Sequence, residues 1–288
     1  MKNIAPRIKS TKHSPDLREW EPDNFSNVLR EIEHLVKHAE GHDPLVLFRG
    51  HVDYRWYLEC TLVRTILSRL PAARRRYPRP IEFHTGVVDL LLQKFGKFWR
   101  PSQEAFIKEH SDGIDAWYEL MKRFQQYAEE DTDPKGTFLI DWTYDMDVAL
   151  YFATYDGRGA ARRPRKTEGA IWICDPVPTG KVWMQDKVRL GEILHHMDTD
   201  SFRLKAEKTL PLLIHPPRQT RMRRAHNQKP VYFSQMDFRT DMADAWCSKE
   251  RETQSAVFRK IILNNSILPE CMAYLEQACI DESYVYPE

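Results

Sequence analysis

The sequence predicts an α+β fold, in which short apolar strands and amphipathic helices are mixed without a regular βαβ rhythm. Strand-like segments follow helical ones at uneven intervals along the chain. Neither a G-x-G-x-x-G run nor a P-loop occurs, and both are typical of doubly wound parallel sheets. Hydrophobic residues make up 42% of the 288 residues, so the chain buries a sizeable core and is not disordered.

The predicted helices combine apolar and polar residues at helical spacing and cover residues 24–40, 61–70, 83–99, 114–128, 146–155 and 269–278. The predicted strands are short apolar runs and cover residues 45–48, 137–142, 170–174, 210–214, 231–233 and 257–264. Gly41 stops the first helix. We therefore expect an N-terminal helical segment over residues 1–44 and one domain over residues 45–288, with a helical insertion at residues 80–130.

Composition limits the class of protein. No apolar run is long enough to cross a membrane, and the first twenty residues lack the apolar core of a signal peptide, so we expect a cytoplasmic protein without a membrane partner. The five cysteines contain no C-x-x-C pair, which favours reduced thiols over a metal site. The net charge is only +1, yet basic residues cluster at 69–79, 158–166 and 218–229. These clusters form either a nucleic-acid-binding face or three separate solvated loops.

Two apolar strands end in polar groups, which is where sites are usually built. The strand over residues 45–48 leads into Arg49 and Gly50, and the strand over residues 137–142 leads into Thr143. An arginine offers a planar fork of donors to phosphate or carboxylate, and glycine lets a ligand or a second backbone approach. The alternative is a buried ion pair between Arg49 and Asp141 that only fastens the two strands.

Three blocks of this sequence together follow the pattern of a known family. The first is LFRGHVDYRWYLECTLVR from Leu47, in which His51, Trp56 and Arg64 hold family positions. The second is LIDWTYDMDVALYFA from residue 139. The third keeps only a spacing and contains Arg224, Gln228 and Tyr232, each four residues apart, and the chain closes in a similar aromatic-Pro tail. These blocks resemble the FRG-domain family. Phe138 stands where that family has an arginine, and Pro230 where it has a glycine.

The order of these motifs is similar to that of the ADP-ribosyltransferase superfamily. The resemblance implies a central split β-sheet surrounded by helices, with NAD as co-substrate. Arg49, Thr143 and Gln228 would be its three motif positions. Gly50 and His51 would lie beside Arg49 at the cofactor.

The resemblance also implies a role for each of the three motif positions. Arg49 would anchor a phosphate or ribose, Thr143 the nicotinamide ribose, and Gln228 the ribose 2′-hydroxyl. Thr143 also has a structural interpretation, because Thr143 or Asp145 could simply cap the helix that follows.

Four further residues are candidates for the same site. Trp142 or Tyr151 would stack on the cofactor, although their apolar spacing is more often that of residues in the core. Asp141 or His226 would deprotonate the acceptor. His226 lies in a basic segment and is otherwise a solvated surface residue.

The function implied by the resemblance is an NAD-dependent ADP-ribosyltransferase that acts as an intracellular toxin or antiviral defence effector. We expect a nucleic-acid acceptor, RNA or DNA, because basic residues crowd before the third block: Arg218, Arg221, Arg223, Arg224 and Lys229. A neutralising protein partner, or antitoxin, would dock on the N-terminal amphipathic segment. The alternative is a non-catalytic FRG domain that binds a nucleotide or a partner, since Gln228 replaces the usual carboxylate.

Overall fold

A seven-stranded mixed sheet forms the centre of the protein, in a computed structural model that describes residues 18–38, 46–71, 79–98, 134–157, 159–174, 212–214, 223–235, 237–243 and 258–287. In spatial order the strands are β1 (Arg18–Trp20), β9 (Phe258–Leu263), β6 (Gly169–Cys174), β2 (Leu47–His51), β3 (Leu139–Thr143), β8 (Pro230–Ser234) and β7 (Leu212–Ile214). Only β1 and β9 run parallel; all other neighbours are antiparallel. A sheet of this kind with helices confirms the predicted mixture of α and β.

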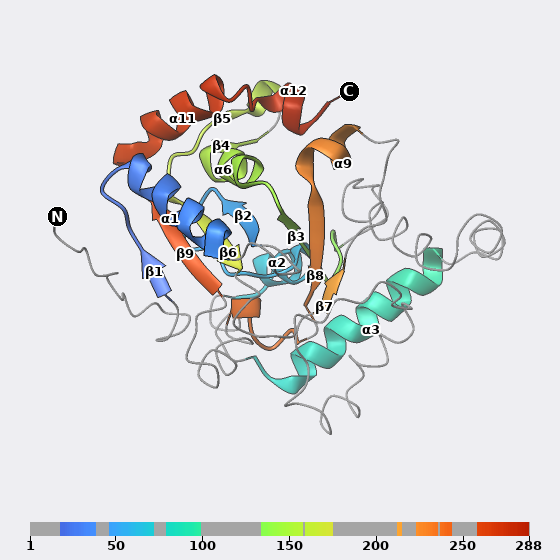
Figure 1. Ribbon diagram of the computed structural model, residues 1–288. Helices are drawn as coiled ribbons and strands as arrows, with labels where there is room; N and C mark the ends of the chain where they lie inside the picture. The colour runs from blue at the N-terminus through green and yellow to red at the C-terminus, as the bar shows by residue number, and fades with distance from the viewer. Residues whose placement is uncertain are drawn as a thin grey trace.

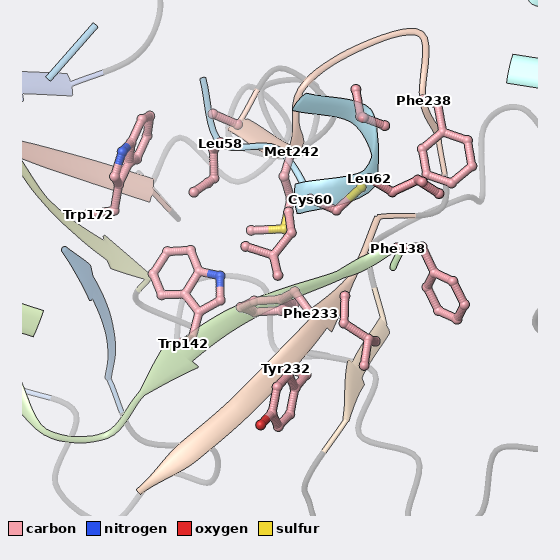
Figure 2. Close-up of a cluster of buried hydrophobic side chains, with 14 of the residues drawn as sticks. Leu58, Cys60, Leu62, Phe138, Trp142, Trp172, Tyr232, Phe233, Phe238 and Met242 are labelled. Atoms are coloured by element: carbon pink, nitrogen blue, oxygen red, sulfur yellow. The ribbon is translucent and has the colours of Figure 1, made fainter. Parts of the chain in front are cut away.

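Two hydrophobic clusters lie against this sheet. Figure 1 shows the helices that contribute to them. One is built with α1 (Phe25–His38), α6 (Met146–Thr154), α11 (Leu268–Gln277) and α12 (Glu282–Val285). The other is built with α2 (Thr61–Ser68) and α3 (Ile81–Phe98), and Figure 2 shows its aromatic centre. Strand β6 is buried along its whole length. Its side chains point alternately into one cluster and the other, because successive side chains of a strand point to opposite faces.

Most predicted elements are present with shifted ends. Strand β2 begins at Leu47 and continues to His51, so Arg49 and Gly50 lie inside the strand and not after it. Strand β3 likewise includes Thr143. The helix expected over residues 114–128 lies outside the described residues, as do Arg218 and Arg221. The short helices α9 (Arg223–Gln228) and α12 were not predicted, because neither has a long apolar period.

The described part of the N-terminal segment packs on the same core as the rest of the chain. Strand β1 pairs with β9, and Glu19 on β1 forms a buried ion pair with Lys260, 2.9 Å apart. The apolar face of α1 is buried through Phe25, Val28 and Ile32. That face is therefore covered by the chain itself and is not an open docking surface. Within the described residues, no helix is long and apolar enough to cross a membrane.

Candidate functional site

The site lies where the sheet opens between β2 and β3. These strands pair only at Phe48 and Thr143, whereas β2 pairs with β6, and β3 with β8, along five residues each. Beyond Phe48 the Arg49 side chain bridges the opening and donates from Nη1 to the main-chain oxygen of Asp141. A pocket of about 210 Å³ lies here, lined by Phe48, Arg49, Gly50, Asp141, Trp142, Thr143, Val148, Ala149, Phe152, Arg224, Gln228, Pro230, Tyr232 and Tyr286.

Arg49 is half-buried at the pocket wall and oriented by two acceptors. Its Nε donates to Nε2 of His51 at 2.9 Å, and its Nη1 donates to the main chain of β3. Burial and the nearby charge of Arg64 lower the pKa of Arg49 to about 10, against the opposing effect of the Asp141 carboxylate. The side chain of Asp141 is exposed, and the hydrogen bond to this residue is to its main chain. A buried ion pair is therefore not what holds Arg49 in place.

His51 lies behind Arg49 and does not line the pocket. Burial, followed by the charges of Arg49, Arg64 and Lys260, holds its pKa well below the usual value. The imidazole is therefore neutral, and because Nε2 accepts from Arg49, the proton lies on Nδ1. Its role in this arrangement is to position the guanidinium, whereas the sequence placed it at the cofactor.

Gly50 is required by a close approach of helix α6. A Cβ atom at this position would lie 1.9 Å from the main-chain oxygen of Ala149 and 2.7 Å from the nitrogen of Ala153. Of the two expectations for this glycine, the structure therefore supports the approach of a second backbone. The contact places α6 directly over β2 and so forms one wall of the pocket.

Thr143 joins three elements around the pocket. Its hydroxyl donates to the main-chain oxygen of Gln228 at 2.6 Å and accepts from the nitrogen of Asp145 at 2.9 Å. Asp145 is the N-cap of α6, as the helix-entry interpretation predicted, and also pairs with Lys229 at 2.9 Å. Because the hydroxyl already donates its single proton to Gln228, it can only accept a hydrogen bond from a ligand.

Helix α9 brings the third block to the same pocket. Arg224 and Gln228 lie four residues apart, which places them on one face of a helix, and both line the pocket together with Tyr232. Gln228 Nε2 donates to the main-chain oxygen of Val285 at 2.7 Å, which holds the C-terminal tail against α9. The helix ends at Gln228, and the next residue, Lys229, adopts a positive φ of 41° and turns the chain into β8.

The aromatic groups of the pocket differ from those expected. Trp142 contributes to the wall, but its ring packs 5.5 Å from the ring of Phe233 in the core (Figure 2). Tyr151 is buried away from the pocket, and burial raises its pKa to about 12. Phe152 and Tyr286 line the pocket instead, edge to face at 6.1 Å.

Two residues of the pocket lacked a clear sequence signal. Phe152 lies four positions after Val148, so both lie on the face of α6 that lines the pocket, but nothing in the sequence marks this face as the one beside a pocket. Tyr286 belongs to the aromatic-Pro tail, where no spacing singles it out. The guanidinium of Arg224 lies over its ring at 4.9 Å. His226, a candidate base, is exposed on α9 and does not line the pocket.

The described residues contain no group of three or more metal-ligating side chains. Residues 44–161 match the FRG domain family. No curated protein and no solved structure matches the chain.

The FRG match includes nine of the fourteen residues that line the pocket. Among them are Arg49, Gly50, Asp141, Thr143 and the pocket-lining face of α6. The other five, from α9, β8 and the C-terminal tail, follow the matched segment in the chain. The pocket is thus assembled from the FRG segment and from residues that only the fold brings to it.

Proposed function

We propose that the protein is an NAD-dependent ADP-ribosyltransferase whose active site is the pocket between β2 and β3. The observation that carries the proposal is that Arg49, Asp141 and Gln228, which come from three separate blocks, line one pocket. The opening of the sheet at this point also supports a split-sheet architecture of the ADP-ribosyltransferase kind. Arg49 and Arg224 offer positive charge, and Phe152, Tyr232 and Tyr286 offer aromatic surface.

The reaction breaks the bond between nicotinamide and ribose. The electron pair leaves with nicotinamide, positive charge develops on the ribose, and an acceptor then bonds to the ribose carbon and loses its proton. Asp141 is the only carboxylate among the described residues that line the pocket, so it is placed to stabilise that charge or accept the proton. Gln228 uses its amide nitrogen on Val285, which leaves its oxygen for the ribose 2′-hydroxyl.

The volume of the pocket limits what it holds. Pockets for drug-sized ligands usually enclose roughly 300–1,000 Å³. The present pocket encloses about 210 Å³, which suits one part of a dinucleotide. We assign it to the nicotinamide ribose, with the phosphates directed toward Arg49 and the remainder of NAD outside.

Nicotinamide release from NAD tests this proposal. We expect the wild type to release nicotinamide and Asp141→Asn to be slower by about 100-fold, the usual loss when one electrostatic stabiliser is removed. Asp156→Asn is the matched control, because Asp156 is an exposed carboxylate that pairs with Arg163 outside the pocket. The absence of release by the wild type, or equal rates for the two variants, would contradict the proposal.

A non-catalytic nucleotide-binding domain is the second candidate. It is favoured by Gln228, which brings no charge to the position where a carboxylate would stabilise the transition state. The same samples distinguish the two functions. Saturable binding of NAD by calorimetry without nicotinamide release would identify a binding domain.

The biological role that we propose with the transferase is that of a toxin or antiviral defence effector, kept in check by a protein partner. Arg223 is exposed at the start of α9 beside the pocket-lining Arg224, which supports a polyanionic acceptor such as RNA or DNA. Expression of the wild type should arrest growth, whereas Arg49→Ala should be tolerated. Label from NAD that appears only on protein would contradict the nucleic-acid acceptor.

A further inference from the structure

Arg49 belongs to a second group of side chains that extends from the pocket to the surface. We call Arg49, His51, Trp56 and Arg64 the arginine–tryptophan cluster. The His51 ring accepts from Arg49 and lies 5.8 Å from the Trp56 ring, and the Arg64 guanidinium lies 5.9 Å from the centre of that indole. The four side chains therefore form a continuous series of contacts between the loop before α2 and the pocket.

Trp56 is the surface end of this cluster. It is 42% exposed, and with Val36 it is one of the two large hydrophobic side chains that the described residues leave open to solvent. Its indole is flanked by His51 and Arg64, so its position is fixed on the protein side. An exposed, fixed indole beside a cation offers a stacking surface for a planar ring.

Positive charge in the cluster has no carboxylate in contact with it among the described residues. Arg64 donates from Nη2 to the Thr61 hydroxyl at 3.1 Å, which is a neutral partner. Arg49 and Arg64 are linked through the contacts of His51 and Trp56, and the charge of Arg64 lowers the pKa of both Arg49 and His51. A bound anion would favour the charged form of both guanidinium groups.

The neighbouring acids on this side of the sheet each bind another cation. Asp53 pairs with Arg55 at 2.6 Å, Glu59 pairs with Arg79, and Glu19 pairs with Lys260 at 2.9 Å. Asp141 raises the pKa of Arg49, but this effect is smaller than the lowering by Arg64. The described structure therefore leaves the cluster with an excess of positive charge.

We propose that Arg49 and Arg64 together hold a phosphate group of a nucleotide, and that Trp56 stacks on the base of the same nucleotide. This subsite deepens the proposed function, on which it rests for the kind of ligand. The fork of Arg49 is fixed by His51 and by the main chain of Asp141, and its Nη2 has no acceptor among the described residues. A phosphate oxygen is the charged acceptor that such a fork fits best.

Calorimetric titration with ADP, inorganic pyrophosphate and adenosine tests the subsite. We expect the wild type to bind ADP and pyrophosphate and to bind adenosine at least about tenfold more weakly. Arg64→Gln should weaken binding of ADP and of pyrophosphate by about tenfold or more, the effect of losing a charged hydrogen bond. Trp56→Ala should weaken binding of ADP about tenfold and leave pyrophosphate unchanged, because only ADP carries a base.

Arg55→Gln is the matched control. Arg55 lies next to Trp56 in the same loop, is exposed and is already paired with Asp53, so its loss should leave both affinities unchanged. Arg64→Lys keeps the charge without the planar fork of donors and should retain part of the pyrophosphate affinity. An unchanged melting temperature of both Arg64 variants would show that weaker binding does not come from misfolding.

Three results would overturn the subsite. The first is equal pyrophosphate affinity in the wild type and Arg64→Gln, and the second is equal affinity of the wild type for adenosine and ADP. The third is an Arg64-dependent affinity for a single-stranded oligonucleotide without affinity for ADP. Each of these leaves the transferase proposal standing if the wild type still releases nicotinamide from NAD. The converse result, binding of ADP through Arg64 without nicotinamide release, would support the subsite and reject the transferase.

Discussion

Two cations on the sheet, Lys260 on β9 and Arg49 on β2, have opposite surroundings. Lys260 is fully buried, pairs with Glu19 at 2.9 Å and lies over the rings of Trp172 and Tyr54. Arg49 is half-buried, binds a neutral imidazole and a main-chain oxygen, and borders a pocket. A buried cation that is paired with a carboxylate holds strands together. A half-buried cation that is held by neutral acceptors is not neutralised by them and can bind an anionic ligand.

The largest expected effect is the loss of stability when the ion pair between Glu19 and Lys260 is broken. Glu19→Ala leaves the Lys260 charge buried without its counter-charge, so we expect the free energy of unfolding to fall by about 3–5 kcal/mol. Urea unfolding measures the change. The control is Asp156→Ala, which removes an exposed partner of Arg163 and should change stability by less than about 1 kcal/mol. Equal losses in the two variants would show that the Glu19 pair does not fasten β1.

The next largest effect is the loss of stability expected when a side chain is added at Gly50, next to Arg49. A methyl group at this position meets the main chain of α6 at 1.9 Å, so Gly50→Ala should lower the free energy of unfolding by about 1–3 kcal/mol or more through overpacking. Gly86→Ala is the control, because nothing lies within 4 Å of an added Cβ there. A stable Gly50→Ala protein without activity would instead indicate that a ligand needs this space.

Replacement of the half-buried cation should change stability little. Arg49→Met removes a charge whose burial is unfavourable, together with two hydrogen bonds, so we expect a change within about 1 kcal/mol while nicotinamide release is lost. Thermal unfolding and the release assay, on the same preparation, measure both quantities. A loss of stability as large as that of Glu19→Ala would place Arg49 with Lys260 as a structural cation.

The smallest effect is the pH dependence of stability. Folding lowers the pKa of Arg49 from its usual value to about 10, so above pH 10 the folded protein releases a proton that the unfolded chain still binds. Stability contributed by this group therefore rises as pH increases. The free energy of unfolding of the wild type, minus that of Arg49→Met, should increase between about pH 9 and pH 11. A decrease would mean that folding raises the pKa of Arg49 and that the guanidinium has a tight anionic partner.

The sequence predicted this fold well where the chemistry is local. Helix α6 and strand β6 appear within one or two residues of their predicted ends, because apolar periodicity directly reports which face a segment buries. Asp145 was identified among the candidate caps of α6 for the same reason. The predicted ends of β2 were wrong, since the continuation of the strand through Arg49 and Gly50 depends on pairing with β6.

The site residues show the limit of such reasoning. Arg49, Asp141 and Gln228 were selected from the sequence and lie in one pocket. The rings expected at the ligand are in the core or away from the pocket, because residue type does not specify which way a side chain faces. Phe152 faces the pocket and Tyr151 does not, and only the packing of α6 on Gly50 sets that rotation.

The sequence by itself determined most of the longer elements, the match to the FRG domain family and the residues able to hold an anion, because composition and spacing are properties of short segments. Tertiary structure alone decided that β2 and β3 separate after one pair of residues and that α9 and the tail close the opening. It also decided that Lys260 meets a carboxylate, whereas Arg49 meets none among the described residues. Partners far apart in the chain fix these contacts, and no local pattern encodes a partner's position.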